Sequence, residues 1–141
     1  ETSIGLDRMF LTVLSHSFRE EKLGNGESRV VLKIPAVLAP IKAAILPLTK
    51  KDGMPEKARE IMKSLQIDFN CQYEEKDSIG KRYRRQDAIG TAFCITVDHQ
   101  TLEDNTVTIR DRDTMKQERV SVEKLHSILA EKVNIAKYLE S

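Results

Sequence analysis

The sequence contains no tryptophan, and aromatic residues make up only 5% of its 141 positions. It has no apolar run near the roughly 20 residues that a membrane-crossing helix needs, and its first residues lack a basic segment followed by an apolar one. Neither charge dominates, because 23 Lys and Arg face 22 Asp and Glu for a net charge of +1. General attraction to nucleic acid is thereby excluded, and any such binding must come from local clusters. We expect a soluble, cytoplasmic protein.

Cysteine and histidine are also scarce. Cys71 and Cys94 each lie in an apolar or strand-like run, and neither has the nearby Cys or His that a zinc site requires. His16, His99 and His126 are too far apart in sequence to suggest a metal site or a catalytic triad. We therefore expect two buried, reduced thiols and no metal site.

The first 40 residues carry a separate pattern. Apolar residues recur at three- and four-residue spacing from Ser3 to Phe18, which predicts an amphipathic helix. The polar, glycine-containing stretch 19–27 predicts an exposed loop, and 29–34 favours a strand. Pro35 and Pro40 then indicate a connection between two units. Because the chain begins with Glu1 and enters a patterned segment at once, we expect it to be a piece of a longer protein.

The rest of the chain alternates strand and helix patterns, which predicts a partly parallel sheet with right-handed crossovers. The last two strands form a hairpin that we expect at a sheet edge. The expected strands are 43–46, 69–73, 92–97, 106–110 and 117–122, and the expected helices begin at Pro55, Ser78 and Ser121.

A basic cluster opens the second of these helices. Lys81, Arg82, Arg84 and Arg85 surround Tyr83, so four cations occupy five positions. Within about 1.4 helical turns they cannot all pair with helix neighbours, and together with a stacking tyrosine they suit phosphates and an unstacked base. A solvated helix face with Tyr83 half-buried remains the alternative.

A second cluster, Arg110, Asp111, Arg112 and Asp113, lies at the predicted hairpin turn. Arginine forks donate hydrogen bonds in pairs, and aspartates accept them from exocyclic amines such as that of cytosine. The alternative is that these residues pair with one another in exposed ion pairs, each contributing roughly 0 to 1 kcal/mol.

Several motifs together resemble one enzyme family. Gly5-Leu6-Asp7-Arg8, preceded by Glu1-Thr2-Ser3, resembles motif 3 of class II aminoacyl-tRNA synthetases in its glycyl form. Segments similar to the anticodon-binding domain of that family follow in the same order: 35–42, 46–48, 78–83, 87–90 and 108–115. The chain therefore resembles the C-terminal part of a class II glycyl-tRNA synthetase over nearly its whole length.

The resemblance implies a fold. It is an α/β, anticodon-binding-domain-like mixed five-stranded sheet flanked by helices and preceded by a helix left from the catalytic domain. Residues 1–39 would be the end of that catalytic domain, and residues 40–141 the anticodon-binding domain.

The resemblance also implies site residues. Arg8 and Gly5 would contact ATP, and Glu1 and Ser3 would lie near bound glycine. Facing the anticodon of tRNA(Gly), whose second and third bases are cytosines, would be Arg110, Asp111, Arg112, Asp113, Lys81, Arg82 and Tyr83. Ile41 stands where an aromatic residue commonly precedes the lysine, so no stacking role is expected there.

The implied parent is a homodimer that uses ATP and Mg²⁺ to attach glycine to tRNA. We expect the chain alone to be inactive in aminoacylation, because the other class II motifs would lie upstream of Glu1. We also expect it to bind an anticodon stem-loop weakly and with strong salt dependence, and replacing Arg110 or Arg112 with alanine to weaken that binding.

Two other functions fit parts of the sequence. A non-catalytic nucleic-acid-binding module of the same fold, such as a synthetase-like polymerase accessory subunit, would have no need for Glu1, Ser3 and Arg8. A small-molecule-binding α/β domain of the flavodoxin kind would need a phosphate loop after the first strand, and residues 50–53 contain a single glycine.

Overall fold

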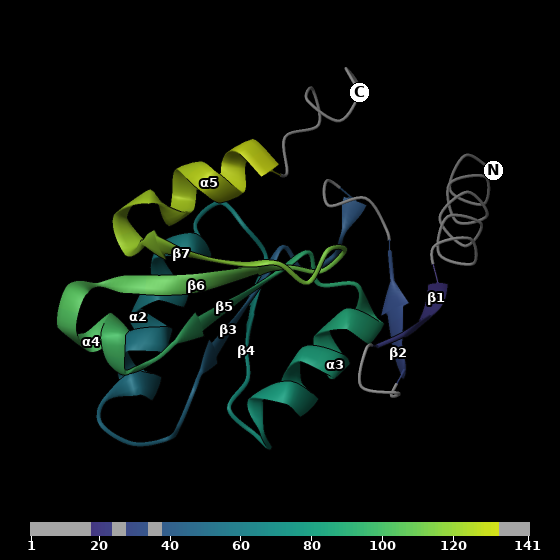
Figure 1. Cartoon of the computed structure of the whole chain (residues 1–141). Helices are drawn as coiled ribbons and strands as arrows, with labels where there is room; N and C mark the ends of the chain where they lie inside the picture. The colour runs from purple at the N-terminus through teal and green to yellow at the C-terminus, as the bar shows by residue number, and fades with distance from the viewer. Residues whose placement is uncertain (1–17, 24–27, 34–37, 133–141) are drawn as a thin grey trace.

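A mixed five-stranded sheet organises the protein, whose computed structural model describes residues 18–23, 28–33 and 38–132. The strand order is β4-β3-β5-β6-β7, with bounds Cys71–Tyr73, Ala43–Pro47, Phe93–Val97, Thr106–Asp111 and Gln117–Ser121. The helices are α2 (Met54–Leu65), α3 (Ile79–Ile89), α4 (His99–Asp104) and α5 (Leu125–Lys132), the last preceded by the 3₁₀ turn η2 (Val122–Lys124). An antiparallel hairpin of β1 (Phe18–Lys22) and β2 (Ser28–Leu32) lies beside this unit (Figure 1).

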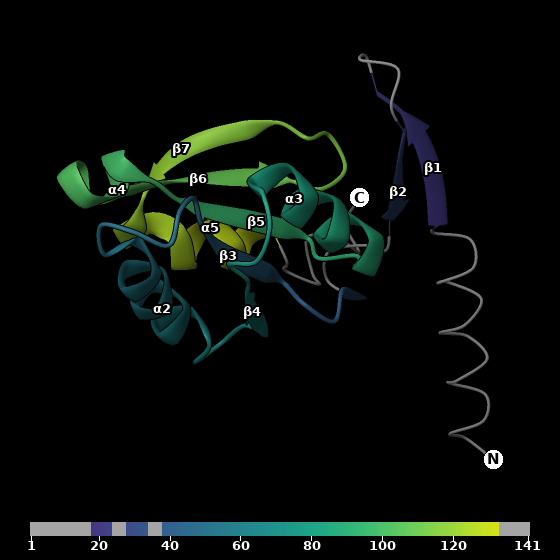
Figure 2. The same ribbon diagram turned by 90° about the horizontal axis from the view of Figure 1, so that it is seen from below.

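The order of the strands determines which face each helix covers. The chain moves from β3 to β4 on one side, then passes back across β3 to reach β5 on the other, and both pairings are parallel. Because such crossovers are right-handed, two that run in opposite directions place their helices on opposite faces. Figure 2 shows this result, with α3 on one side of the sheet and α2 and α5 on the other.

Strands β6 and β7 pair antiparallel to their neighbours, so no crossover helix follows either of them. The expected mixed five-stranded sheet is confirmed, including the hairpin at its edge. A flavodoxin-like architecture would require the strands to be parallel throughout, which this sheet is not.

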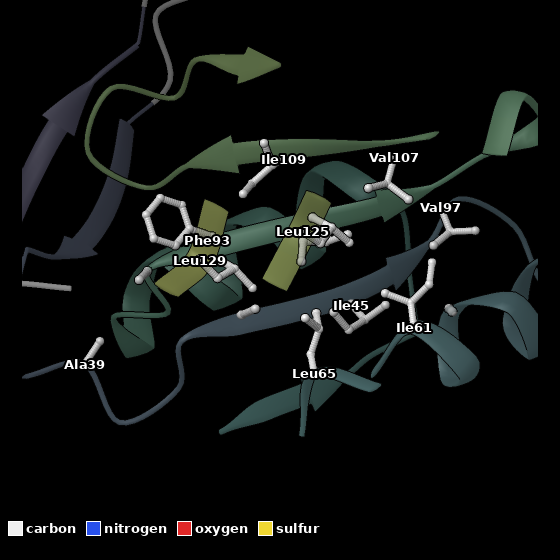
Figure 3. Packing of buried hydrophobic residues seen from close by; sticks show 14 of the residues in the cluster. Ala39, Ile45, Ile61, Leu65, Phe93, Val97, Val107, Ile109, Leu125 and Leu129 are labelled. Atoms are coloured by element: carbon white, nitrogen blue, oxygen red, sulfur yellow. The ribbon is translucent and has the colours of Figure 1, made fainter. Parts of the chain in front are cut away.

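The larger core lies between the sheet and α2 and α5. Phe93 and Val97 of β5 point to this side together with Leu125 and Leu129 of α5 (Figure 3). Ile95, the alternate residue between them, belongs to the same cluster. A smaller cluster on the other face joins Ala44, Leu46 and Cys94 to Ile79 and Tyr83 of α3. Strands β3 and β5 are thus buried on both faces, as their continuous apolar runs indicate.

Local signals explain where α3 begins and ends. The side chain of Ser78 accepts a hydrogen bond from the backbone N–H of Lys81 and caps the first turn. Gly90 ends the helix with φ of 83°, a left-handed conformation that favours glycine. Both were expected from the sequence, and they fix the length of the helix that carries the basic cluster.

The thiols partly follow the expectation. Cys94 is buried and Cys71 is half-buried, and neither forms a disulfide. Burial raises the pKa of Cys94 to about 12 and that of Cys71 to about 11. Both are therefore neutral thiols near pH 7, without the thiolate character that reactive cysteines have.

Several sequence predictions need correction or completion. Residues 19–22, expected in a loop, belong to β1, because pairing with β2 supplies backbone hydrogen bonds that the local sequence does not reveal. The short helix α4 was not predicted; Asp98 and Thr101 form its capping box. The expected helix from Ser3 lies outside the described residues except for Phe18, which begins β1. None of the described helices is both long and apolar enough to span a bilayer.

We predict that Ile95→Ala lowers the free energy of unfolding by about 2 to 5 kcal/mol, because it removes a fully buried side chain from the central strand. Urea unfolding followed by circular dichroism measures the change. Ile67→Ala is the matched control, since this side chain is 81% exposed and its loss should change stability by less than about 0.5 kcal/mol. Equal effects of the two substitutions would contradict the assignment of the core.

Candidate nucleic-acid interface

The basic cluster of α3 divides into buried and exposed members. Arg82 is 1% exposed, and its guanidinium donates hydrogen bonds to the carbonyls of Pro47 at 2.6 Å and Glu74 at 3.1 Å. Burial lowers the pKa of Arg82. This side chain ties the start of α3 to the end of β3 and to the segment after β4.

Two cations of the cluster face solvent on one side of the helix. Lys81 is exposed, and the side chain of Arg84 is 39% exposed although its Nη1 also lies 3.9 Å from Oδ2 of Asp87. Residues three apart lie on the same face of a helix, so these two charges are neighbours. Arg85 is exposed but makes ion pairs with Glu74 and Asp77.

A single buried carboxylate collects two arginines from distant parts of the chain. Asp87 of α3 is 1% exposed. Its Oδ1 accepts from Nη1 of Arg110 at 2.8 Å, while its Oδ2 accepts from Nη2 of Arg110 at 3.1 Å and from Nη1 of Arg29 at 3.0 Å. Charges removed from water in this way persist only when paired and hydrogen-bonded, and this cluster meets both conditions.

Arg110 also stacks on the aromatic ring of the cluster. Its guanidinium carbon lies 4.7 Å from the centre of the Tyr83 ring, and the Tyr83 hydroxyl lies 2.7 Å from Oγ1 of Thr96. Burial lowers the pKa of Arg110, but the hydrogen bonds and charge of Asp87 outweigh it and hold the pKa above its usual value. Tyr83 is half-buried, as the alternative interpretation proposed, and one face of its ring already holds Arg110.

The β6–β7 turn, residues 111–116, has a fixed backbone. Oδ1 of Asp111 accepts from the backbone N–H groups of Asp113 at 2.8 Å and Thr114 at 3.2 Å. The carbonyl of Asp111 accepts from the N–H of Met115 at 2.9 Å, and Met115 adopts a φ of 61°. A non-glycine residue in this region costs of order 1 kcal/mol or more, so the surroundings must enforce the conformation.

Arg112 joins this turn to the end of α3. It is 2% exposed, and it donates to the carbonyl of Gly90 at 2.9 Å and to Oδ1 of Asp113 at 2.9 Å. The side chain of Asp113 is 52% exposed, so its outer surface still faces solvent. One of the expected self-pairings, Arg112 with Asp113, is therefore present, while Arg110 instead pairs with Asp87 across the molecule.

Arg110 and Arg112 of the second cluster lie on the same face of the sheet as α3. Asp111 instead lines a pocket with Phe93 and Lys132 on the other face. The turn is beside the C-terminal end of α3, as Figures 1 and 2 both show. Lys81 is near the N-terminal end, roughly 12 Å away along the helix axis by the rise per residue. The structure thus brings the clusters together, with Lys81, Tyr83, Asp111 and Asp113 at least partly exposed and Arg82, Arg110 and Arg112 buried.

Sequence reasoning missed three charged residues here. Arg29 is 58 positions from Asp87 and 83 from Arg112, and Asp87 is 23 positions from Arg110, so no local pattern indicated that these residues pair. Arg119 of β7 lies on the face that α3 leaves open and donates to Oγ1 of Thr106 at 2.9 Å. The alternation of residues 117–121 would have placed Arg119 on the side of Arg110.

The motif 3 residues Arg8, Gly5, Glu1 and Ser3 lie outside the described residues. Among residues 18–23, 28–33 and 38–132, no group of three or more His, Cys, Asp or Glu side chains is arranged to hold a metal ion. The arrangement around α3 and the turn presents exposed charged and hydrogen-bonding side chains, among them Lys81 and Asp113.

Residues 42–132 match the family described as the anticodon binding domain. The chain belongs to this family. The match begins just before β3 and ends with α5, so it covers the whole five-stranded unit, α3 and the β6–β7 turn.

Curated relatives confirm the resemblance to glycyl-tRNA synthetases that the motifs indicated. The glycine–tRNA ligases of Clostridium tetani (strain Massachusetts / E88) and Chlorobaculum tepidum are each 53% identical to this anticodon-binding chain over 133 residues. That of Borrelia hermsii is 49% identical over 127 residues. The alignments cover 94%, 94% and 90% of this chain but only 28% of each relative.

A solved structure shares the fold. The RNA binding domain of threonyl-tRNA synthetase from Cryptosporidium parvum Iowa II superposes with a TM-score of 0.65 at 22% sequence identity, covering 71% of this chain and 25% of that one. At this identity the similarity concerns the fold alone. It agrees with the architecture of an anticodon-binding domain.

We predict that Asp87→Asn lowers the free energy of unfolding by about 3 to 5 kcal/mol, because it leaves buried arginine charge without its carboxylate. Urea unfolding measures the loss. Asp52→Asn is the matched control: the side chain of Asp52 is 63% exposed, its φ of 62° suits asparagine, and the change should be below about 0.5 kcal/mol. A stability loss for Asp87→Asn no larger than that of the control would show that the buried cluster contributes little.

The hairpin should loosen in acid. The hydrogen bond from Lys33, opposed by burial and assisted by Arg29, holds the pKa of Glu21 below its usual 4.5. A lowered pKa means that the carboxylate stabilises the folded state above pH 4.5 and loses this contribution as the pH falls through its folded-state value. The difference in unfolding midpoint between the unsubstituted chain and Glu21→Gln should therefore shrink as the pH is lowered from neutrality to below 4.5. A constant difference would contradict this assignment.

Proposed function

We propose that this chain supplies the anticodon recognition of a glycine–tRNA ligase that uses ATP and Mg²⁺ to attach glycine to tRNA(Gly). The observation that carries the proposal is the match to glycine–tRNA ligases over 94% of the chain. Since the chain spans about 28% of the length of those relatives, catalysis is assigned to the remainder of the parent protein.

The proposed contact area is the α3–turn surface, which we define as Lys81, Tyr83, Arg84 and Asp113. It offers cations to phosphates at Lys81 and Arg84. Asp113 offers carboxylate oxygens, which accept hydrogen bonds from the exocyclic amine of cytosine. This combination suits the unpaired cytosines of a glycine anticodon better than a duplex, because splayed bases expose their hydrogen-bonding edges.

The buried arginines have a different part in this proposal. Buried hydrogen bonds from these arginines fix α3 relative to the sheet and the turn; the residues are Arg82, Arg110 and Arg112. They would place the exposed groups of the α3–turn surface and would not themselves reach a base in this conformation. Alanine at Arg110 or Arg112 should still weaken RNA binding, but through altered structure, so exposed residues give the cleaner test.

The upstream residues complete the proposal. Arg8 and Gly5 would contact ATP, and Glu1 and Ser3 would lie near glycine, in an ATP site whose other parts lie elsewhere in the parent. The chain alone would therefore not aminoacylate tRNA. The parent would act in the cytoplasm as a homodimer.

We predict that the chain binds an RNA stem-loop carrying a glycine anticodon and that it loses about tenfold in affinity between 50 and 200 mM salt, as expected for about two phosphate contacts. Lys81→Ala should weaken binding and reduce the salt dependence by about one released ion. Fluorescence anisotropy with a labelled stem-loop measures both quantities.

The matched control is Lys63→Ala, which removes an exposed lysine from the last turn of α2, on the other face of the sheet. It should leave affinity and salt dependence unchanged. Binding that is insensitive to salt, or equally weakened by both substitutions, would exclude the α3–turn surface as the RNA-binding site.

A further inference from the structure

We propose that Arg29 is a positioning residue for RNA recognition and that, through it, the β1–β2 hairpin is part of the recognition unit. The proposal rests on the proposed function of the α3–turn surface and extends it to a segment outside the matched domain. The match covers residues 42–132, whereas Arg29 lies in β2, well before it.

Arg29 makes contact with three separate elements. It is 2% exposed, and its Nη1 donates to Oδ2 of Asp87 in α3 at 3.0 Å. The same Nη1 donates to the backbone carbonyl of Arg112 at 2.9 Å, and Nη2 donates to that of Asp113 at 3.4 Å. On the hairpin itself, Nε and Nη2 both bond to Oε1 of Glu21.

These contacts are directional, because they end on main-chain atoms of the turn. The carbonyl of Arg112 belongs to the peptide that links it to Asp113. A hydrogen bond that fixes this carbonyl therefore also fixes the backbone direction at the exposed Asp113. The turn already contains a strained backbone at Met115, with φ of 61°. Strained conformations persist where the surroundings over-determine them, and they concentrate at functional sites.

Only arginine can make this set of contacts. Its planar guanidinium presents five donors in a fixed fork, while lysine has one ammonium on a flexible stem. A lysine at this position could keep the charge beside Asp87 but could not also hold Glu21 and both carbonyls of the turn.

The other arginine on Asp87 makes the role of Arg29 separable. Arg110 bonds to both oxygens of Asp87, so the carboxylate stays paired when Arg29 is removed. Removing Arg29 should then weaken only the contact with the hairpin and the hydrogen bonds that Arg29 donates to the turn carbonyls of residues 112 and 113. The core between the sheet and α2 should be unaffected.

The test compares the full 141-residue chain with Arg29→Met, Arg29→Lys and the control Arg59→Met. Arg59 is an exposed arginine of α2 whose guanidinium carbon lies 4.8 Å from the centre of the Tyr73 ring, on the opposite face of the sheet. The first measurement is hydrogen exchange at the backbone N–H groups of Asp111 and Met115, with Gln66 after α2 as an internal reference.

We expect exchange in the turn to be about tenfold faster in Arg29→Met and Arg29→Lys, with Gln66 and the Arg59→Met protein unchanged. The second measurement is the ratio of affinities for two stem-loops, one with the anticodon cytosines and one with uracils in their place. This affinity ratio should fall by about tenfold in both Arg29 variants, which is a typical size for the coupling between two sites in one protein. The salt dependence of binding should not change, because the phosphate contacts remain.

Unchanged exchange in the turn, or an unchanged affinity ratio in both Arg29 variants, would overturn the positioning role. So would a ratio that falls equally in Arg59→Met, since that effect would not depend on the hairpin. If the unsubstituted chain shows no preference between the stem-loops, the proposed function fails, while faster exchange confined to the turn still supports the structural link from Arg29.

Discussion

One buried carboxylate organises the functional side of this molecule. Asp87 holds Arg110 from the sheet and Arg29 from the hairpin, and neither arginine has appreciable exposure to water. Electrostatic attraction in a poorly hydrated interior is strong, but so is the cost of an incomplete set of partners. The Asp87 carboxylate and its two arginines therefore fix three things. These are the position of α3 against β6, the contact with the β1–β2 hairpin and, through Arg29, the backbone of the turn.

The topology explains why charged and polar side chains gather on the α3 face of the sheet. Two right-handed crossovers in opposite directions leave α3 as the one described helix on its side, and the β6–β7 hairpin adds two strands without adding another described helix there. The polar residues of β6 and β7 on that side, such as Thr108 and Arg119, are consequently not covered by apolar packing. Antiparallel strands commonly leave one face to solvent, and this part of the sheet follows that pattern.

Much of the fold was predictable from the sequence, and the site much less so. Apolar runs identified β3 and β5, alternation identified β6 and β7, and Ser78 and Gly90 marked the ends of α3 because these signals are local. The sequence also located the basic cluster and the turn. It could not show that Arg82, Arg110 and Arg112 are buried, since burial depends on partners such as Asp87 and the carbonyl of Gly90. Strand β1 was not predicted for the same reason, because it is defined only by its pairing with β2.

The two edges of the sheet also have a consequence for how the domain behaves on a longer chain. Strand β4 is three residues long, and β7 begins with the exposed polar residues Gln117, Glu118 and Arg119. Short strands and charged side chains discourage a second sheet from adding to an exposed edge. The sheet thus presents a polar face without offering either edge as a template for intermolecular β-pairing.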